Sequence, residues 1–157
     1  MAGFNITTQC YIRRDSDVLF IHKGRNDMNT GKHLGIGGHL EEGEAPAECI
    51  VREIFEETGI KETELSKLRM RAVITFVNSV YEDEYIILYE AEYTGNEDPA
   101  LRSCSEGELK WVDRRDIYDL PIWEGDKYIF DIFFESTDFF ELKLIYDKDV
   151  LKEVRNF

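Results

Sequence analysis

The sequence lacks the features that mark an exported or membrane-bound protein. Its three cysteines, Cys10, Cys49 and Cys104, are odd in number and show no CxxC spacing, so we expect reduced thiols and no disulfide framework. No apolar run approaches the roughly 20 residues that cross a bilayer, and no basic start precedes an apolar segment as in a signal peptide. We therefore expect a cytoplasmic protein that does not enter a membrane.

Positive charge is also scarce. The chain has 19 lysines and arginines against 33 aspartates and glutamates, which gives a formal net charge of −14. Such a protein repels a nucleic-acid duplex and an anionic lipid surface. A small anionic substrate fits only if cations stand between it and the acidic groups, as at a magnesium site held by carboxylates. We therefore expect neither duplex nucleic acid nor membrane among its partners.

Linkers, internal repeats and low-complexity tracts are absent from the sequence as well. A chain of 157 residues suits one domain of common size, so we predict a single domain over residues 1–157. Its 43% hydrophobic and 13% aromatic content is typical of globular chains and not of disordered ones. The sequence leaves both a monomer and a homodimer open.

Strand and helix signals interleave along the chain. Runs of β-branched and aromatic residues predict strands at residues 5–14, 18–23, 70–78, 85–93, 109–112 and 139–146. Helical signals predict a helix that starts at Pro46, a short helical turn at 113–118 and a helix at 123–134. This order of hairpins and helices indicates the α+β class, with a mixed β-sheet between helices on both of its faces.

The first predicted helix carries much of the acidic charge. Residues 38–60 contain seven glutamates. Pro46 suits the first helical turn, because its missing N–H would be unpaired there anyway, and Gly59 suits a left-handed helix end. One face of the helix follows an apolar i, i+3, i+4, i+7 spacing and is expected to pack on the core: Ala47, Ile50, Val51 and Ile54.

Glu53, Glu56 and Glu57 lie three and four residues apart, so they share another arc of this helix. They repel one another and stand near the helix C-terminus, where the dipole disfavours anions. One interpretation is an ordinary solvated face. We favour a divalent-metal site, because a purely structural helix would end in Lys or Arg and because carboxylates are the hard ligands that magnesium requires.

The full motif is Gly38, five residues, Glu44, seven residues, then Arg52-Glu53-Ile54-Phe55-Glu56-Glu57-Thr58-Gly59-Ile60. At every fixed position it resembles the signature of the Nudix hydrolases, and the flanking order of strands and helices also looks like that family. The resemblance implies an α/β/α sandwich. It also implies magnesium-dependent hydrolysis of a nucleoside diphosphate linked to another moiety.

The same resemblance implies the metal ligands and the catalytic set. Mg²⁺, with Mn²⁺ as a substitute, would be held by the Gly37 carbonyl and by the carboxylates of Glu53, Glu56 and Glu57. Those glutamates would also orient or deprotonate the attacking water. The ions would neutralise phosphate charge and lower the pKa of bound water.

Two further roles come from the resemblance. Arg52 would pair with Glu44 and hold the glycine-rich loop and the helix in register. Members of the family often add an acid from a loop after the central strands, and Glu106, five residues before Trp111, is our candidate as a metal ligand. Glu108 is its rival, and an ordinary loop charge is an equally open interpretation of either residue.

The segment LPIWEGDKY resembles the C-terminal region of the MutT-type 8-oxo-dGTP diphosphatases. Trp123 and Asp126 match residues that contact the base in that group, whereas Gly125 replaces a second acid. Leu34 stands where an asparagine reads the base edge, and Lys23 could meet phosphates. A core aromatic and a helix-start acid are the alternative interpretations of Trp123 and Asp126.

We expect a Mg-dependent nucleoside triphosphate diphosphatase, acting on 8-oxo-dGTP or another purine nucleotide, that releases a nucleoside monophosphate and pyrophosphate and sanitises the nucleotide pool. A hydrolase of ADP-ribose, dinucleoside polyphosphate or capped RNA is the alternative among enzymes. A nucleotide-sensing module without activity is the alternative outside them. Such a module would be expected to lose signature glutamates, and all of them are present here.

Overall fold

The computed structural model describes residues 3–24, 28–101 and 107–157. Its strands are β1 (Phe4–Arg14), β2 (Asp17–Lys23), β3 (His33–Leu34), β4 (Ile36–His39), β5 (Leu65–Asn78), β6 (Asp83–Tyr93), β7 (Gly107–Asp113), β8 (Phe140–Asp147) and β9 (Val150–Asn156). Its helices are α1 (Pro46–Thr58) and α2 (Asp126–Glu135), with 3₁₀ turns η1 (Glu62–Glu64), η2 (Pro99–Leu101) and η3 (Arg114–Asp119). Among the residues described, no helix is long and apolar enough to span a membrane.

The strands form one mixed sheet in the order β3-β2-β1-β6-β5-β8-β9, with β4 also paired to β1 and β7 to β2. The β1–β6 and β5–β8 pairs are parallel, and the others are antiparallel. Strand β1 is central in the sheet, because its middle residues pair with β4, its last residues pair with β2 and its other edge pairs with β6. It thereby fixes the glycine-rich strand β4 beside the centre of the sheet.

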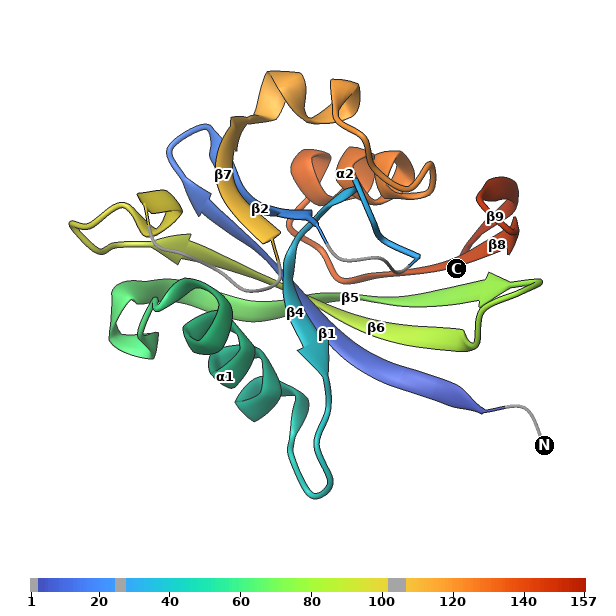
Figure 1. Ribbon diagram of the computed structural model, residues 1–157, viewed down its shortest axis with the longest axis horizontal. Helices are drawn as coiled ribbons and strands as arrows, with labels where there is room; N and C mark the ends of the chain where they lie inside the picture. The colour runs from blue at the N-terminus through green and yellow to red at the C-terminus, as the bar shows by residue number, and fades with distance from the viewer. Residues whose placement is uncertain (1–2, 25–27, 102–106) are drawn as a thin grey trace.

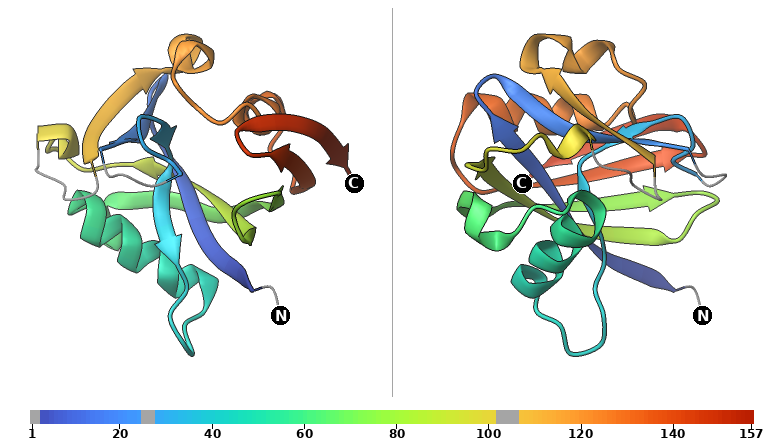
Figure 2. Two further views of the ribbon diagram at one scale, coloured as in Figure 1. Left: turned by 45° about the vertical axis from the view of Figure 1, so that its right-hand side comes forward. Right: turned by 60° about the vertical axis from the view of Figure 1, so that its left-hand side comes forward.

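Each face of the sheet carries one α-helix (Figure 1). Ile50 and Ile54 of α1 pack with Cys10 and Ile12 of β1 in one core cluster. On the other face, Phe130 and Phe133 of α2 pack in an aromatic cluster with Tyr11 of β1. The rotated views keep the two helices on opposite sides of the sheet (Figure 2). The predicted mixed sheet between helices is confirmed.

Helix α1 has the predicted ends. Pro46 stands in its first turn, and Gly59 ends it at φ 74° while its N–H donates to the Phe55 carbonyl. The prediction that Ala47 faces the core is wrong, because it is exposed and burial begins only at Cys49. The helix therefore rests on the sheet from its second turn onward, and its first turn projects beyond the core.

Strands β3, β4 and β9 were not apparent from sequence patterns. Two of them have two and four residues, too few to show alternation, and β4 is half glycine. Strand β9 closes the edge of the sheet as a hairpin with β8. Helix α2 begins at Asp126, three residues later than predicted.

Candidate active site

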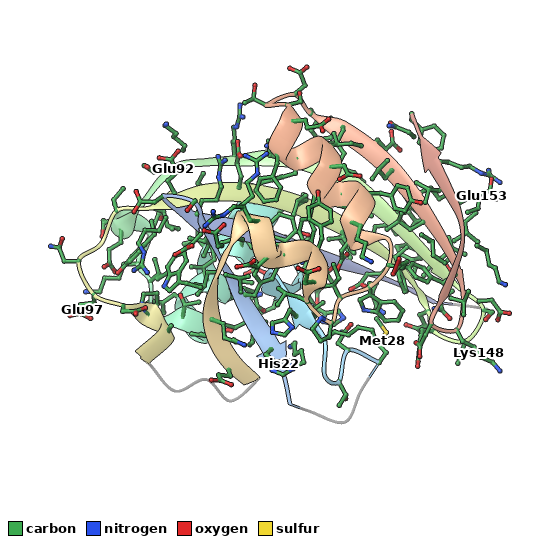
Figure 3. The ribbon with its side chains drawn as sticks, turned by 90° about the horizontal axis from the view of Figure 1, so that it is seen from above. His22, Met28, Glu92, Glu97, Lys148 and Glu153 are labelled. Atoms are coloured by element: carbon green, nitrogen blue, oxygen red, sulfur yellow. The ribbon has the colours of Figure 1, made fainter. Side chains whose placement is uncertain are left out.

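A cavity of about 650 Å³ opens between α1 and β4 on one side and the start of α2 on the other. Its acidic end is formed by Arg52, Glu53, Glu56 and Glu57 of α1. Its aromatic end is formed by Phe76, Trp123, Asp126 and Tyr146. Figure 3 views this region from above, with Met28, another lining residue, labelled beside α2. One continuous hollow thus joins the carboxylates to an aromatic pocket.

Two adjacent glycines let α1 approach the sheet. A Cβ atom on Gly37 would lie 1.9 Å from the backbone oxygen of Thr8, and one on Gly38 would lie 2.5 Å from the Glu53 carboxylate. Neither position has room for a side chain. The first glycine keeps β4 against β1, and the second leaves the space that the Glu53 carboxylate occupies.

The two contacts predict different effects when each glycine is replaced by alanine. Gly37→Ala should lower the free energy of unfolding strongly, because a backbone atom of a central strand must move. Gly38→Ala should cost less stability but lower turnover at least tenfold, because the flexible Glu53 side chain is displaced instead. Urea unfolding and steady-state kinetics of both variants check this contrast. Equal stability losses, with activity retained by Gly38→Ala, would contradict it.

Arg52 organises the acidic end. Its Nε and Nη2 donate to both carboxylate oxygens of Glu44 at 2.7 and 2.8 Å. Its Nη1 donates to Glu53 at 2.9 Å and to Glu56 at 3.2 Å, and Nη2 also donates to the His39 carbonyl at 3.2 Å. The guanidinium lowers the pKa of Glu44 to about 2, so this carboxyl is an anion at any physiological pH. Arg52 therefore ties the loop before α1 to the helix.

The oxygen donors of this end suit a divalent cation in their chemistry. Within the described residues, no three acidic, His or Cys side chains already lie close enough to enclose an ion. Arg52 instead forms ion pairs with four glutamates: Glu41, Glu44, Glu53 and Glu56. Glu57 lines the same wall, so carboxylates outnumber cations there. Glu56 has a 55% exposed side chain and can reorient at little cost. The donor set fits a hard ion.

Trp123 closes the aromatic end. It is only 6% exposed, its Nε1 donates to Asn29 Oδ1 at 2.8 Å, and its ring packs against Phe76 and Tyr146 at centroid distances of 5.3 and 5.1 Å. The Lys32 ammonium lies 4.4 Å from the ring centroid. Trp123 is thus part of the core, as one interpretation expects, and it also lines the cavity.

Asp126 lies next to Trp123 at the first turn of α2 and is only partly exposed. Removal of its carboxyl from bulk water raises its pKa to about 7, although a backbone hydrogen bond at Trp123 and the charge of Lys32 act in the opposite direction. Both protonation states are therefore populated near neutral pH. Such a carboxyl can either accept or donate a hydrogen bond to a heterocycle.

The raised pKa of Asp126 predicts a pH-dependent stability. Because the folded-state pKa of about 7 lies above the ordinary value of 3.8, the folded protein binds this proton more tightly than the unfolded chain. The resulting stabilisation is complete at low pH and is lost as the pH rises through about 7. Asp126→Asn should remove this slope, as measured by urea unfolding of both proteins at several pH values. If the free energy of unfolding changed with pH in the same way for both proteins, the raised pKa of Asp126 would be contradicted.

The other predicted residues fall into three groups. Lys23, Leu34 and Gly37 line the cavity. Glu44 pairs with Arg52 but does not itself line the cavity. Glu108 lies on β7 opposite His22, is exposed and does not line the cavity either. Glu106 lies outside the described residues.

Several lining residues had no signal in the sequence: Thr7, Gln9, Asn29, Phe76, Glu84 and Tyr146. They come from strands and a loop far apart in the chain. Only the pairing of β1 with β6, β6 with β5 and β5 with β8 brings the strand residues together.

Comparison with known proteins decides the family. A family model described as the NUDIX domain matches residues 4–133. The chain belongs to the Nudix family. Nudix hydrolases act on small nucleotide substrates and generally use divalent metal cations.

Individual relatives agree with this assignment. YvcI, an uncharacterised Nudix hydrolase of Bacillus subtilis (strain 168), is 31% identical over 129 residues, which are 79% of this chain and 75% of that protein. A MutT protein from Bacillus halodurans shares the fold with a TM-score of 0.78 at 26% identity, covering 97% of both chains. A bifunctional NMN adenylyltransferase/ADP ribose pyrophosphatase from Francisella tularensis gives a TM-score of 0.73 at 19% identity, covering 87% of this chain and 42% of that one.

Proposed function

We propose that this Nudix hydrolase is a magnesium-dependent nucleoside triphosphate diphosphatase. Water attacks an internal phosphorus, one phosphoric anhydride bond breaks, and a nucleoside monophosphate and pyrophosphate leave. The observation that carries the proposal is the single cavity that joins the α1 carboxylates to the pocket of Trp123 and Asp126. We propose a purine nucleotide as substrate, with 8-oxo-dGTP among the candidates, and cytoplasmic nucleotide-pool sanitising as the role.

The acidic end suits the triphosphate. Bound Mg²⁺ supplies charge neutralisation and lowers the pKa of a water molecule. Glu53, Glu56 and Glu57 would hold the ion with the Gly37 carbonyl, and one of the glutamates would accept the proton of the attacking water. Arg52 positions these carboxylates through its bonds to Glu53 and Glu56. Lys23 on the cavity wall offers a positive charge to the phosphates.

The aromatic end suits one heterocyclic base. Ile74, Phe76 and Ile86 form an apolar floor, and Asp126 supplies a polar group that can take either protonation state. Stacking of a base on an aromatic side chain is worth roughly 1–3 kcal/mol. A second base would need a second such pocket, and this cavity has one aromatic end, which favours a mononucleotide over a dinucleoside polyphosphate.

A nucleotide panel with Mg²⁺ tests the proposal. Ribo- and deoxyribonucleoside triphosphates, 8-oxo-dGTP, ADP-ribose, dinucleoside polyphosphates and capped RNA are incubated with the protein. Monophosphate, pyrophosphate and orthophosphate are then separated. We expect equal amounts of monophosphate and pyrophosphate from a purine triphosphate. Cleavage confined to ADP-ribose, dinucleotide or capped substrates would overturn the proposal, and tight nucleotide binding without turnover would indicate a sensing module.

A further inference from the structure

Glu84 lines the cavity but belongs to neither of its two ends. It lies near the start of β6, opposite Phe76 of β5 and Asn5 of β1 in the sheet register. It is not part of the Nudix signature. Phe76 lies opposite it and Ile86 lies two positions along the same strand face, while Thr7 and His39 are its polar neighbours. The site described above gives it no role.

The surroundings of Glu84 leave its carboxyl without a strong partner. Burial raises its pKa, which a hydrogen bond with Thr7 and the charge of His39 only partly offset. In the described part of the chain, no Arg or Lys side chain forms an ion pair with it, and the guanidinium of Arg52 pairs with other glutamates. A half-buried acceptor of this kind gains most from a donor that a ligand brings.

The sheet register places Glu84 between the glycine strand and the aromatic end, nearest to the latter. Strand β6 is separated from the glycine strand β4 by β1 alone, and from the aromatic residues of β8 by β5 alone. Directly paired residues of neighbouring strands lie about 5 Å apart, so Glu84 stands beside Phe76 of the aromatic end, while the glycines of β4 lie two strands away. A nucleotide with its phosphates at α1 and its base beside Trp123 must pass this point.

We propose that Glu84 is a specificity-determining residue that accepts a hydrogen bond from an uncharged donor of the nucleoside, either a sugar hydroxyl or a base N–H. The proposal rests on the nucleotide chemistry proposed for this cavity. Sites that hydrogen-bond a substrate OH or NH reject analogues that lack it, because the protein group is then left buried and unpaired. Glu84 therefore contributes to substrate choice and not to the metal or the attacking water.

The test compares wild type with Glu84→Gln, which keeps an acceptor oxygen, and Glu84→Leu, which removes it. Glu92→Leu is the matched control, because Glu92 lies at the other end of β6, away from the cavity and from Met28 (Figure 3). Each protein is assayed with matched ribo- and deoxyribonucleotides and with purine nucleotides that have or lack the exocyclic amine. These two comparisons separate a sugar donor from a base donor.

We expect Glu84→Leu to raise KM at least tenfold for the preferred nucleotide while kcat changes less than threefold. It should also reduce the preference for one sugar over the other, or for one base over the other, by a similar factor. Glu84→Gln should have an intermediate effect, and Glu92→Leu should keep wild-type kinetics and preferences. The affinity of the monophosphate product, measured by calorimetry without metal, should fall in parallel.

Two results would overturn this role of Glu84. Unchanged preferences and product affinity in Glu84→Leu would show that Glu84 does not contact the nucleoside. A hundredfold loss of kcat with an altered magnesium dependence would place it at the metal instead. The wild-type protein in the same assays reports separately on the proposed function. If it cleaves a nucleotide other than a triphosphate, the same ratios and affinities are measured on that nucleotide and its product.

Discussion

Glu57→Gln should lower turnover by about 100-fold or more while the protein stays folded. Glutamine has the same shape, but a neutral amide cannot replace an anionic oxygen ligand of a hard cation or accept a proton from water. Glu57 is 8% exposed and lines the acidic end of the cavity, so its carboxylate is held in place by its surroundings. Steady-state kinetics across a range of Mg²⁺ concentrations, with thermal unfolding as the check on the fold, measure the effect.

The matched control is Glu42→Gln, which changes an exposed glutamate of the same signature segment that does not line the cavity. This variant should keep wild-type kinetics. If Glu57→Gln retained near-parental activity at saturating magnesium, the assignment of the α1 carboxylates as the catalytic site would be wrong. An equal loss of turnover in Glu42→Gln would show that activity depends on the net charge of the segment and not on the position of Glu57.

Arg71→Met should lower the free energy of unfolding by about 3–5 kcal/mol. Arg71 lies on β5, is 1% exposed and donates to Glu90 at 3.0 Å. It also donates to three backbone carbonyls at and after the end of α2, those of Phe133, Ser136 and Asp138. Methionine fills similar space but leaves these buried acceptors unpaired.

Arg69→Met is the control for this stability prediction. Arg69 also pairs with Glu90, but its side chain is 48% exposed, so its loss should cost about 1 kcal/mol or less. Glu90 keeps a partner in either variant, because Arg13 also donates to it at 3.1 Å. Urea unfolding of both variants measures the difference. Equal losses would mean that Arg71 does not anchor the end of α2.

Local signals were enough to predict helix α1 and the hairpin strands. Pro46 and Gly59 carry physical preferences for a helix start and a helix end, and these act through neighbouring residues only. The glycines of β4, in contrast, are required by residues that lie far away in the sequence. Gly37 and Gly38 are required by contacts with Thr8 and Glu53, which pattern analysis of a single segment cannot detect.

Residues whose role depends on distant strands could not be predicted. Arg71 falls in the predicted strand 70–78, and nothing in that strand's own pattern shows that the turn after α2 contacts and covers it. Glu84 lies just before the predicted strand 85–93, and the pairing of β6 with β1 and β5 brings it to the cavity. The predicted start of α2 is three residues early. Trp123 is compatible with a helix, but its backbone forms a turn in which its carbonyl accepts from the Asp126 N–H, and α2 begins at Asp126.

The central claim is that one cavity holds both the metal-dependent chemistry and the nucleotide. The most direct measurement is the product analysis of a purine nucleoside triphosphate incubated with the wild-type protein, first with a chelator and then with excess Mg²⁺. We predict no products with the chelator and equal amounts of monophosphate and pyrophosphate once magnesium is restored. Release of orthophosphate alone, or a rate that does not depend on the metal, would contradict the account.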